Sequence, residues 1–334
     1  MAKKFSTFKG VFVPSTEAIL GTVLFLLLPT LAADVGLITI LAIIIASHTV
    51  TFATAFSLSD CATNLDSIGG GGMYALGKRS LGKAFGGSIG IQLFLAQTAS
   101  IGFYCIGFSE PLHPILRPFL EQIPFLAGSG FEDILFQKQV MASSIFILFF
   151  AIVMFGADFT LKIQMIILVV LFGSIATIFV SLFLDVHYEG TALFYGSLKE
   201  INLFGNRALT VPIFFLAFTQ FFPAVTGIDA GVGMSGDLKN PKRSLVQGTF
   251  WAIGVTFVVY LITGFIFTLM NKEMLITGYV NNSATGNLLT VLLGFNRPFP
   301  CNIMGIIILG GILFATGSSA LSCFMTALFF AIFS

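Results

Sequence analysis

A proline, several glycines and a carboxylate interrupt an apolar segment in the second half of the chain. The sequence FFPAVTGIDAGVGMSGDLKNPKRS at 221–244 contains them as Pro223, Gly227, Gly231, Gly233 and Asp229. In a membrane helix such a break frees backbone amides and carbonyls, which hydrocarbon cannot satisfy and which must therefore line a cavity. The segment predicts a site inside the membrane where backbone groups, with a carboxylate beside them, bind an ion or a polar solute.

The first apolar segment repeats this design near the N-terminus, in the sequence VFVPSTEAILGTVLFLLLP. Pro14 removes a backbone donor, Glu17 brings a carboxylate into the segment, and Gly21 permits close approach or unwinding of the backbone. Proline and glycine are also frequent in membrane helices that are merely kinked. Two interruptions at corresponding places in two halves of a chain, however, are typical of the binding sites of secondary transporters.

The composition places these segments in a polytopic membrane protein. Of 334 residues, 56% are hydrophobic and 9% are charged, and the mean hydropathy is +0.99. A soluble surface needs about a quarter to a third charged residues. Apolar runs, several of them longer than the roughly 20 residues that cross a bilayer, predict eight spans. They lie near 10–32, 35–57, 84–109, 140–157, 160–184, 209–236, 245–270 and 302–332.

The predicted fold is therefore all-α, a single transmembrane domain over residues 1–334. Spans 1 and 6 would begin equivalent halves of a five-helix repeat, with a first repeat over about 9–184 and a partial second repeat over about 209–334. Ten of the 16 Lys and Arg residues fall in segments on the side of the N-terminus. This distribution favours a cytoplasmic N-terminus in a plasma or inner membrane.

No pattern in the chain indicates an enzyme, a metal site or a nucleic-acid surface. The four cysteines have neither CxxC spacing nor a nearby histidine partner, and they are Cys61, Cys105, Cys301 and Cys323. The net charge of +1 gathers in no basic patch. The expected partners are the lipid bilayer and small ions or solutes, and no cofactor is expected beyond the transported ions.

The ends of the half-helices predict which charges bind there. A half-helix that ends at a break exposes carbonyls to a cation, and one that begins there exposes amides to an anion. The carbonyls are those around Ala18, Ile19, Pro223 and Thr226, and the amides are those around Gly21–Val23 and Gly227–Ile228. The carboxylates of Glu17 and Asp229 are either functional or sit at helix ends beside local polar groups.

Four stretches of the chain resemble the cation–chloride cotransporters of the amino acid–polyamine–organocation superfamily. They are GVFVPSTEAILGTVLFL, SLSDCATNLDSIGGGGMYALGKRSLGKAFGGSIG, FYCIGFSEPL and FFPAVTGIDAGVGMSGDLKNPKRS. The resemblance covers nearly the whole chain and implies the broken-helix inverted-repeat fold of that superfamily. The function it implies is symport of chloride with potassium or sodium by alternating access.

The resemblance also implies positions for the ions. Potassium would be held by the carbonyls of Ala18, Ile19, Pro223 and Thr226 and by the hydroxyl of Tyr104. Sodium would be held by the hydroxyls of Ser318 and Ser319 in span 8. Chloride would meet the amides of Gly21, Thr22 and Val23 and, at a second position, those of Gly227, Ile228 and Asp229. The alternative for the tyrosine and the serines is a role in helix packing.

The chain departs from the cotransporter pattern at two positions. Ala18 replaces a usual asparagine, although the ligand expected there is a backbone carbonyl. Asp229 falls where the cotransporters usually have an apolar residue, and at about 4 Å its charge would repel chloride by roughly 4 kcal/mol at an effective dielectric of 20. The stretch TGIDAGVGMSGDLKNPKRS also resembles amino acid permeases of the same superfamily, so an amino acid or amine substrate is the alternative.

A five-plus-five repeat needs ten spans, and the sequence provides eight. We therefore expect a C-terminally truncated member of the family, which is a fragment, a truncated gene product or one piece of a split carrier. The partner expected is a chain that supplies the missing helices or a second copy in a homodimer. The further alternative is a non-transporting subunit or remnant.

Overall fold

The long apolar runs of the sequence form long helices. The computed structural model describes residues 4–64, 72–127, 130–183, 187–188, 191–192, 203, 211–270 and 301–333. Its long helices are α4 (Leu37–Asn64), α6 (Lys83–Leu120), α7 (Phe131–Met154), α8 (Ala157–Ser181), α11 (Pro241–Leu269) and α14 (Cys301–Phe333). The shorter elements are α5 (Gly72–Leu81) and the antiparallel pair β1 (His187–Tyr188) and β2 (Thr191–Ala192).

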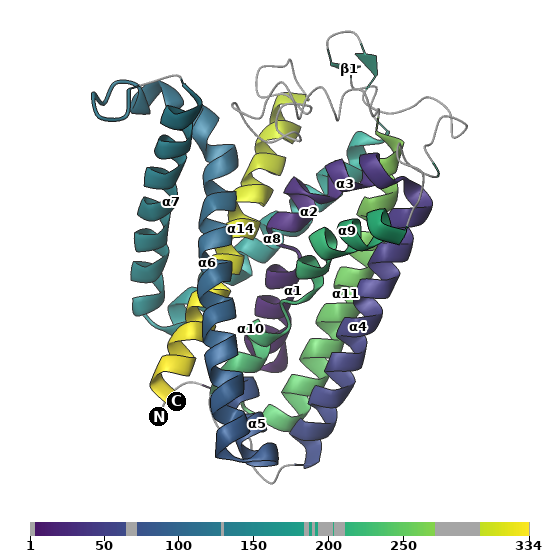
Figure 1. Cartoon of the computed structure of the whole chain (residues 1–334), viewed down its shortest axis with the longest axis vertical. Helices are drawn as coiled ribbons and strands as arrows, with labels where there is room; N and C mark the ends of the chain where they lie inside the picture. The colour runs from purple at the N-terminus through teal and green to yellow at the C-terminus, as the bar shows by residue number, and fades with distance from the viewer. Residues whose placement is uncertain are drawn as a thin grey trace.

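Both predicted interruptions are present. The first segment runs through the π-helix η1 (Phe8–Phe12), α1 (Val13–Ile19) and α2 (Thr22–Leu26), and α3 (Leu28–Val35) follows it. The second runs through α9 (Val211–Phe221), η3 (Phe222–Val225), α10 (Asp229–Val232) and η4 (Gly233–Asp237), where η3 and η4 are 3₁₀ turns. In Figure 1, α1 and α2 lie at the centre of the molecule beside α9 and α10.

Within the described residues, eight helices are long and apolar enough to cross a membrane. They correspond in order to the eight predicted spans, and the all-α prediction is confirmed. The third helix is longer than expected. It was predicted to end near residue 109, but α6 continues through Pro111, Pro114 and Pro118 to Leu120. Prolines are tolerated in membrane helices where neighbouring groups satisfy the freed carbonyls, so they did not end this one.

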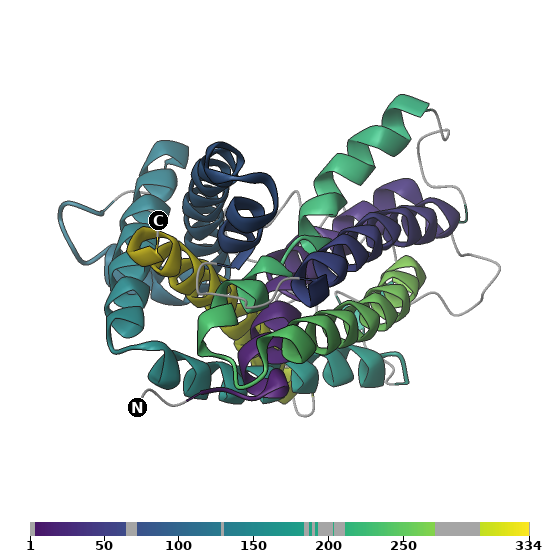
Figure 2. The ribbon, with the colours of Figure 1, turned by 90° about the horizontal axis from the view of Figure 1, so that it is seen from below.

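The helices form two groups with the broken segments between them. One group packs α11 on α4, and the other packs α14 on α6 and α8. Figure 2 shows α6 and α7 on the opposite side of the molecule from α4 and α11. Helix α1 contacts α14, α11, α10 and α8, so it touches both groups. The two breaks are therefore bounded by both groups of helices.

The segment before η1 is held against the second broken helix. Phe5 donates its amide to Asp237 at 2.7 Å and accepts from the amide of Lys239 at 3.0 Å. Lys9 forms an ion pair with Asp158 of α8 at 3.2 Å. These contacts fix the start of the first span relative to η4 and α8.

Candidate functional site

The first break is a two-residue interruption between α1 and α2. Leu20 leaves the helical path with φ −82° and ψ 34°, and its amide still bonds the carbonyl of Thr16. Gly21 follows with φ −80° and ψ −143°, and α2 then starts at Thr22. The carbonyls at the end of α1 and the amides at the start of α2 are thereby released from the helical ladder.

The second break is longer and ends on a carboxylate. Helix α9 tightens into η3, Thr226 caps that turn, and α10 begins at Asp229. The Thr226 hydroxyl donates to the carbonyl of Pro223 at 2.8 Å. Both of these residues are exposed. The Pro223 carbonyl also accepts a longer hydrogen bond of 3.4 Å from the amide of Thr226.

The two breaks touch one another. A Cβ atom on Gly227 would lie 2.7 Å from the Cβ of Ala18 and 2.8 Å from the amide nitrogen of Ile19. The Ser15 hydroxyl donates to the carbonyl of Ile228 at 3.3 Å. Glycine at position 227 is what allows this approach, because any side chain would separate the segments. The structure thus places the end of α1, with Ala18 and Ile19 of the predicted cation site, against Gly227, the residue that follows Thr226.

Helix α14 completes the surroundings of the first break. The Ser318 hydroxyl donates a short hydrogen bond to the Glu17 carboxylate, and the Ser319 hydroxyl donates to the Glu17 carbonyl at 3.0 Å. A Cβ on Gly21 would collide with the Ser319 hydroxyl. The half-buried Tyr104 of α6 is within reach of the same Ser319. The predicted sodium-type serines therefore adjoin the first break.

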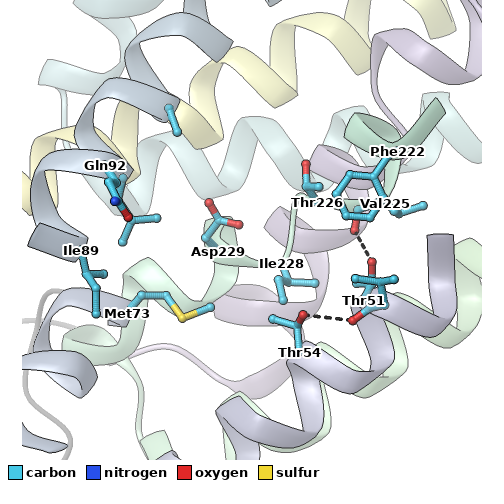
Figure 3. Close-up of a pocket in the computed structure, with 13 residues that line it drawn as sticks. Thr51, Thr54, Met73, Ile89, Gln92, Phe222, Val225, Thr226, Ile228 and Asp229 are labelled. Atoms are coloured by element: carbon cyan, nitrogen blue, oxygen red, sulfur yellow. Dashed lines mark hydrogen bonds between the residues drawn. The ribbon is translucent and has the colours of Figure 1, made fainter. Parts of the chain in front are cut away.

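A cavity of about 380 Å³ opens beside the second break (Figure 3). Its wall includes Thr226, Ile228 and Asp229 from that break, with Met73 and Gln92 facing them. The Asp229 carboxylate accepts a hydrogen bond of 2.7 Å from the Gln97 amide of α6. The cavity is much larger than a bare ion and presents one carboxylate in a mainly apolar lining, which also suits a small organic solute.

The chain matches the family described as Amino acid permease over residues 10–328. It belongs to the amino acid permease family. It is 33% identical to human Solute carrier family 12 member 1 over 298 residues, covering 88% of this chain and 25% of that protein. It is 31% identical to the Vacuolar cation-chloride cotransporter 1 of Saccharomyces cerevisiae over 275 residues, covering 78% of this chain and 24% of that protein.

These comparisons confirm the predicted resemblance to cation–chloride cotransporters. The chain spans about a quarter of the length of the curated relatives it matches. The relatives are named as solute carriers and cotransporters, and the family and these relatives are membrane transporters rather than enzymes. With its apolar helices, the chain is an integral, multi-pass membrane protein. Its fold is that of the broken-helix superfamily to which the family belongs.

In this chain the residues of both predicted anion positions lie at half-helix starts. Gly21, Thr22 and Val23 form the start of α2 and are buried. Gly107 of α6 lies so close to Thr22 that a Cβ there would come within 2.7 Å of its methyl group. At the second position the Asp229 carboxylate lies at the start of α10. Its negative charge already interacts favourably with the free amides of that helix end. Chloride binding at both positions stays a prediction.

Several polar residues of the permease that contact the breaks were missed by reading the sequence. The Tyr260 hydroxyl of α11 donates to the Ile19 carbonyl at 2.7 Å, and the Thr51 hydroxyl of α4 donates to the Val225 carbonyl at 3.1 Å. Gln97 was also overlooked. The available signal was a polar or hydrogen-bonding side chain inside an apolar span, which is uncommon unless it has a structural or functional partner.

Proposed function

We propose that this permease is a secondary transporter that couples chloride to monovalent cations, potassium at the meeting of the two breaks and sodium beside α14. The observation that supports this most is the contact of Gly227 with Ala18 and Ile19, which places the end of α1 against the second break. Such ends carry partial negative charge and can replace the hydration shell of a cation. A relative named as a cation-chloride cotransporter supports the coupling of a cation to chloride.

Alternating access in this proposal takes place between the two groups of helices. The α4–α11 group and the α14–α6–α8 group both contact α1. Rocking one group against the other would expose the breaks first to one side of the membrane and then to the other. The N-terminus, with Lys9 paired to Asp158, lies on the cytoplasmic side in this proposal.

The test is uptake of radiolabelled rubidium, a potassium substitute, by purified protein in liposomes with and without chloride and sodium. Tyr104→Phe removes only the phenol oxygen proposed as a cation ligand. We expect the rubidium concentration for half-maximal uptake to rise about tenfold, equivalent to about 1.4 kcal/mol. Unchanged rubidium affinity in this variant would remove Tyr104 from the cation site.

A second candidate is transport of an amino acid or an amine. The observation that favours it is the cavity of about 380 Å³ with the Asp229 carboxylate in its wall, held by Gln97. A carboxylate in an apolar pocket suits an ammonium group. The same liposomes, given a labelled mixture of amino acids and amines, distinguish the two candidates. Uptake of an amino acid or amine that does not depend on chloride favours the second.

A further inference from the structure

Tyr260 is one of the largest completely buried side chains of the permease. It lies in α11, which packs on α4 and also contacts α1. Its hydroxyl donates to the Ile19 carbonyl of α1 at 2.7 Å, although the two residues are 241 positions apart in the chain. A buried tyrosine hydroxyl usually finds a hydrogen-bond partner, and this one finds it at the end of the first half-helix.

The Ile19 carbonyl depends on this bond for its direction. Ile19 is the last residue of α1, and the chain leaves the helical path at Leu20. Among the residues that the structure describes, no backbone amide across the break donates to this carbonyl, so its donor is Tyr260. A carbonyl oxygen has two lone pairs, and one of them can meet a cation while the other accepts the tyrosine hydroxyl.

Aromatic neighbours hold the ring of Tyr260 in place. The ring of Phe221, the last residue of α9 before the second break, meets it edge to face at 5.2 Å between centroids. The ring of His48 in α4 lies 5.8 Å from it, tilted by 59°. All three side chains are buried. Close packing of this kind restricts the rotamers of Tyr260, so the direction of its hydroxyl is fixed before any ion binds.

The end of α1 is therefore tied to both groups of helices. Tyr260 of the α4–α11 group holds the Ile19 carbonyl, and Ser319 of α14 donates to the Glu17 carbonyl at 3.0 Å. A hydrogen bond from an outer side chain orients a ligand atom and reduces the ordering that binding would otherwise require. Loss of such an outer partner typically weakens ion binding about 10- to 100-fold.

We infer that Tyr260 is a positioning residue, which sets the direction in which the Ile19 carbonyl meets a potassium-type cation at the first break. This role rests on the proposed function, because that function makes Ile19 a cation ligand. Tyr260 acts through Ile19 and is not itself a ligand. The proposed sodium position at Ser318 and Ser319 and the proposed chloride positions do not use the Ile19 carbonyl, so the effect of Tyr260 is specific to the potassium-type cation.

Tyr260→Phe tests this role, because it removes the hydroxyl and keeps the ring. Rubidium uptake by the purified full chain in liposomes is measured at saturating sodium and chloride, and the rate is normalised to the amount of monodisperse protein. We expect the rubidium concentration for half-maximal uptake to rise at least about tenfold. The maximal rate and the half-saturating concentrations of sodium and chloride should stay at their wild-type values. A merely structural role would lower the maximal rate and leave the rubidium half-saturation unchanged.

Thr263→Val is the matched control. It removes another completely buried hydroxyl of α11, which donates to the Val259 carbonyl of the same helix at 2.8 Å, and it should keep the wild-type rubidium half-saturation. If Tyr260→Phe does not fold, fluorotyrosine incorporated at position 260 retains the hydroxyl and reports on it. Its fluorine NMR resonance should shift as rubidium is added, saturate at the rubidium concentration that half-saturation of uptake predicts, and stay in place when sodium is added instead.

The outcomes separate this role from the proposed function. An unchanged rubidium half-saturation in Tyr260→Phe, beside chloride-coupled rubidium uptake by the wild type, overturns the positioning role and leaves the proposed function standing. A fluorine resonance that does not respond to rubidium also overturns it. An equal rise in the half-saturating concentrations of rubidium, sodium and chloride shows a general disturbance of the fold and overturns it as well. Absence of rubidium uptake by the wild type overturns the positioning role and the proposed function together.

Discussion

Replacing Gly227 with alanine perturbs the contact on which the proposed site depends. The new Cβ would lie 2.7 Å from the Cβ of Ala18 and 2.8 Å from its carbonyl carbon, where ordinary contact begins at 3.4 Å. The two broken segments must therefore separate by about 0.7 Å. Because backbone atoms cannot yield as a flexible side chain does, we expect a loss of about 1–3 kcal/mol in the free energy of unfolding.

The same displacement acts on cation binding. A separation of about 0.7 Å exceeds the roughly 0.2 Å tolerance of ion–ligand distances, so the carbonyls from the two breaks can no longer contact one ion together. We expect rubidium affinity to fall at least about tenfold, or 1.4 kcal/mol. The assay is rubidium uptake in liposomes as a function of rubidium concentration, with apparent Tm in detergent measured on the same preparation.

Gly254→Ala is the control for this substitution, because nothing lies within 4 Å of a Cβ at that position of α11. It should leave uptake unchanged and keep or slightly raise the Tm, since alanine favours a helix by about 1 kcal/mol over glycine. If Gly227→Ala retains wild-type rubidium affinity and Tm, the contact between the breaks does not control the site, and the reasoning fails.

Two further substitutions test contacts that hold the first segment in place. Tyr260→Phe removes the hydroxyl that donates to the buried Ile19 carbonyl, so thermal unfolding should show a loss of about 1–3 kcal/mol; an unchanged Tm would show that this carbonyl finds another donor. Lys9→Gln breaks the partly exposed ion pair with Asp158, so the Tm should fall only slightly, and the difference should vanish in high salt. A loss that persists in high salt would contradict an electrostatic role.

The fold was predictable from the sequence because hydrophobic length and backbone breakers act locally. Each of the eight predicted spans corresponds to an observed helix, and the breaks lie where proline and glycine interrupt apolar runs. The end of α6 was placed too early, at residue 109, whereas the helix continues through three prolines to Leu120. In a membrane, neighbouring helices can satisfy the freed carbonyls, and one sequence does not reveal those neighbours.

The contacts between segments far apart in the chain could not be predicted from the local sequence. The sequence placed Ala18, Ile19 and Gly227 at breaks, but their mutual approach depends on how two helices cross. The bond from Gln97 to Asp229 joins residues 132 positions apart. That of Ser318 to Glu17 spans 301 positions. Such pairs are set by tertiary packing, so the sequence could only mark each polar residue as unusual in its span.

The most direct test of the account is whether a chloride gradient drives rubidium into liposomes that contain the purified chain. The membrane potential is clamped, rubidium is equal on both sides at the start, and protein-free liposomes give the background. Cation–chloride coupling predicts accumulation of rubidium above equilibrium when chloride is higher outside, and loss of rubidium when the chloride gradient is reversed. Rubidium that stays at equilibrium under both gradients would contradict cation–chloride coupling.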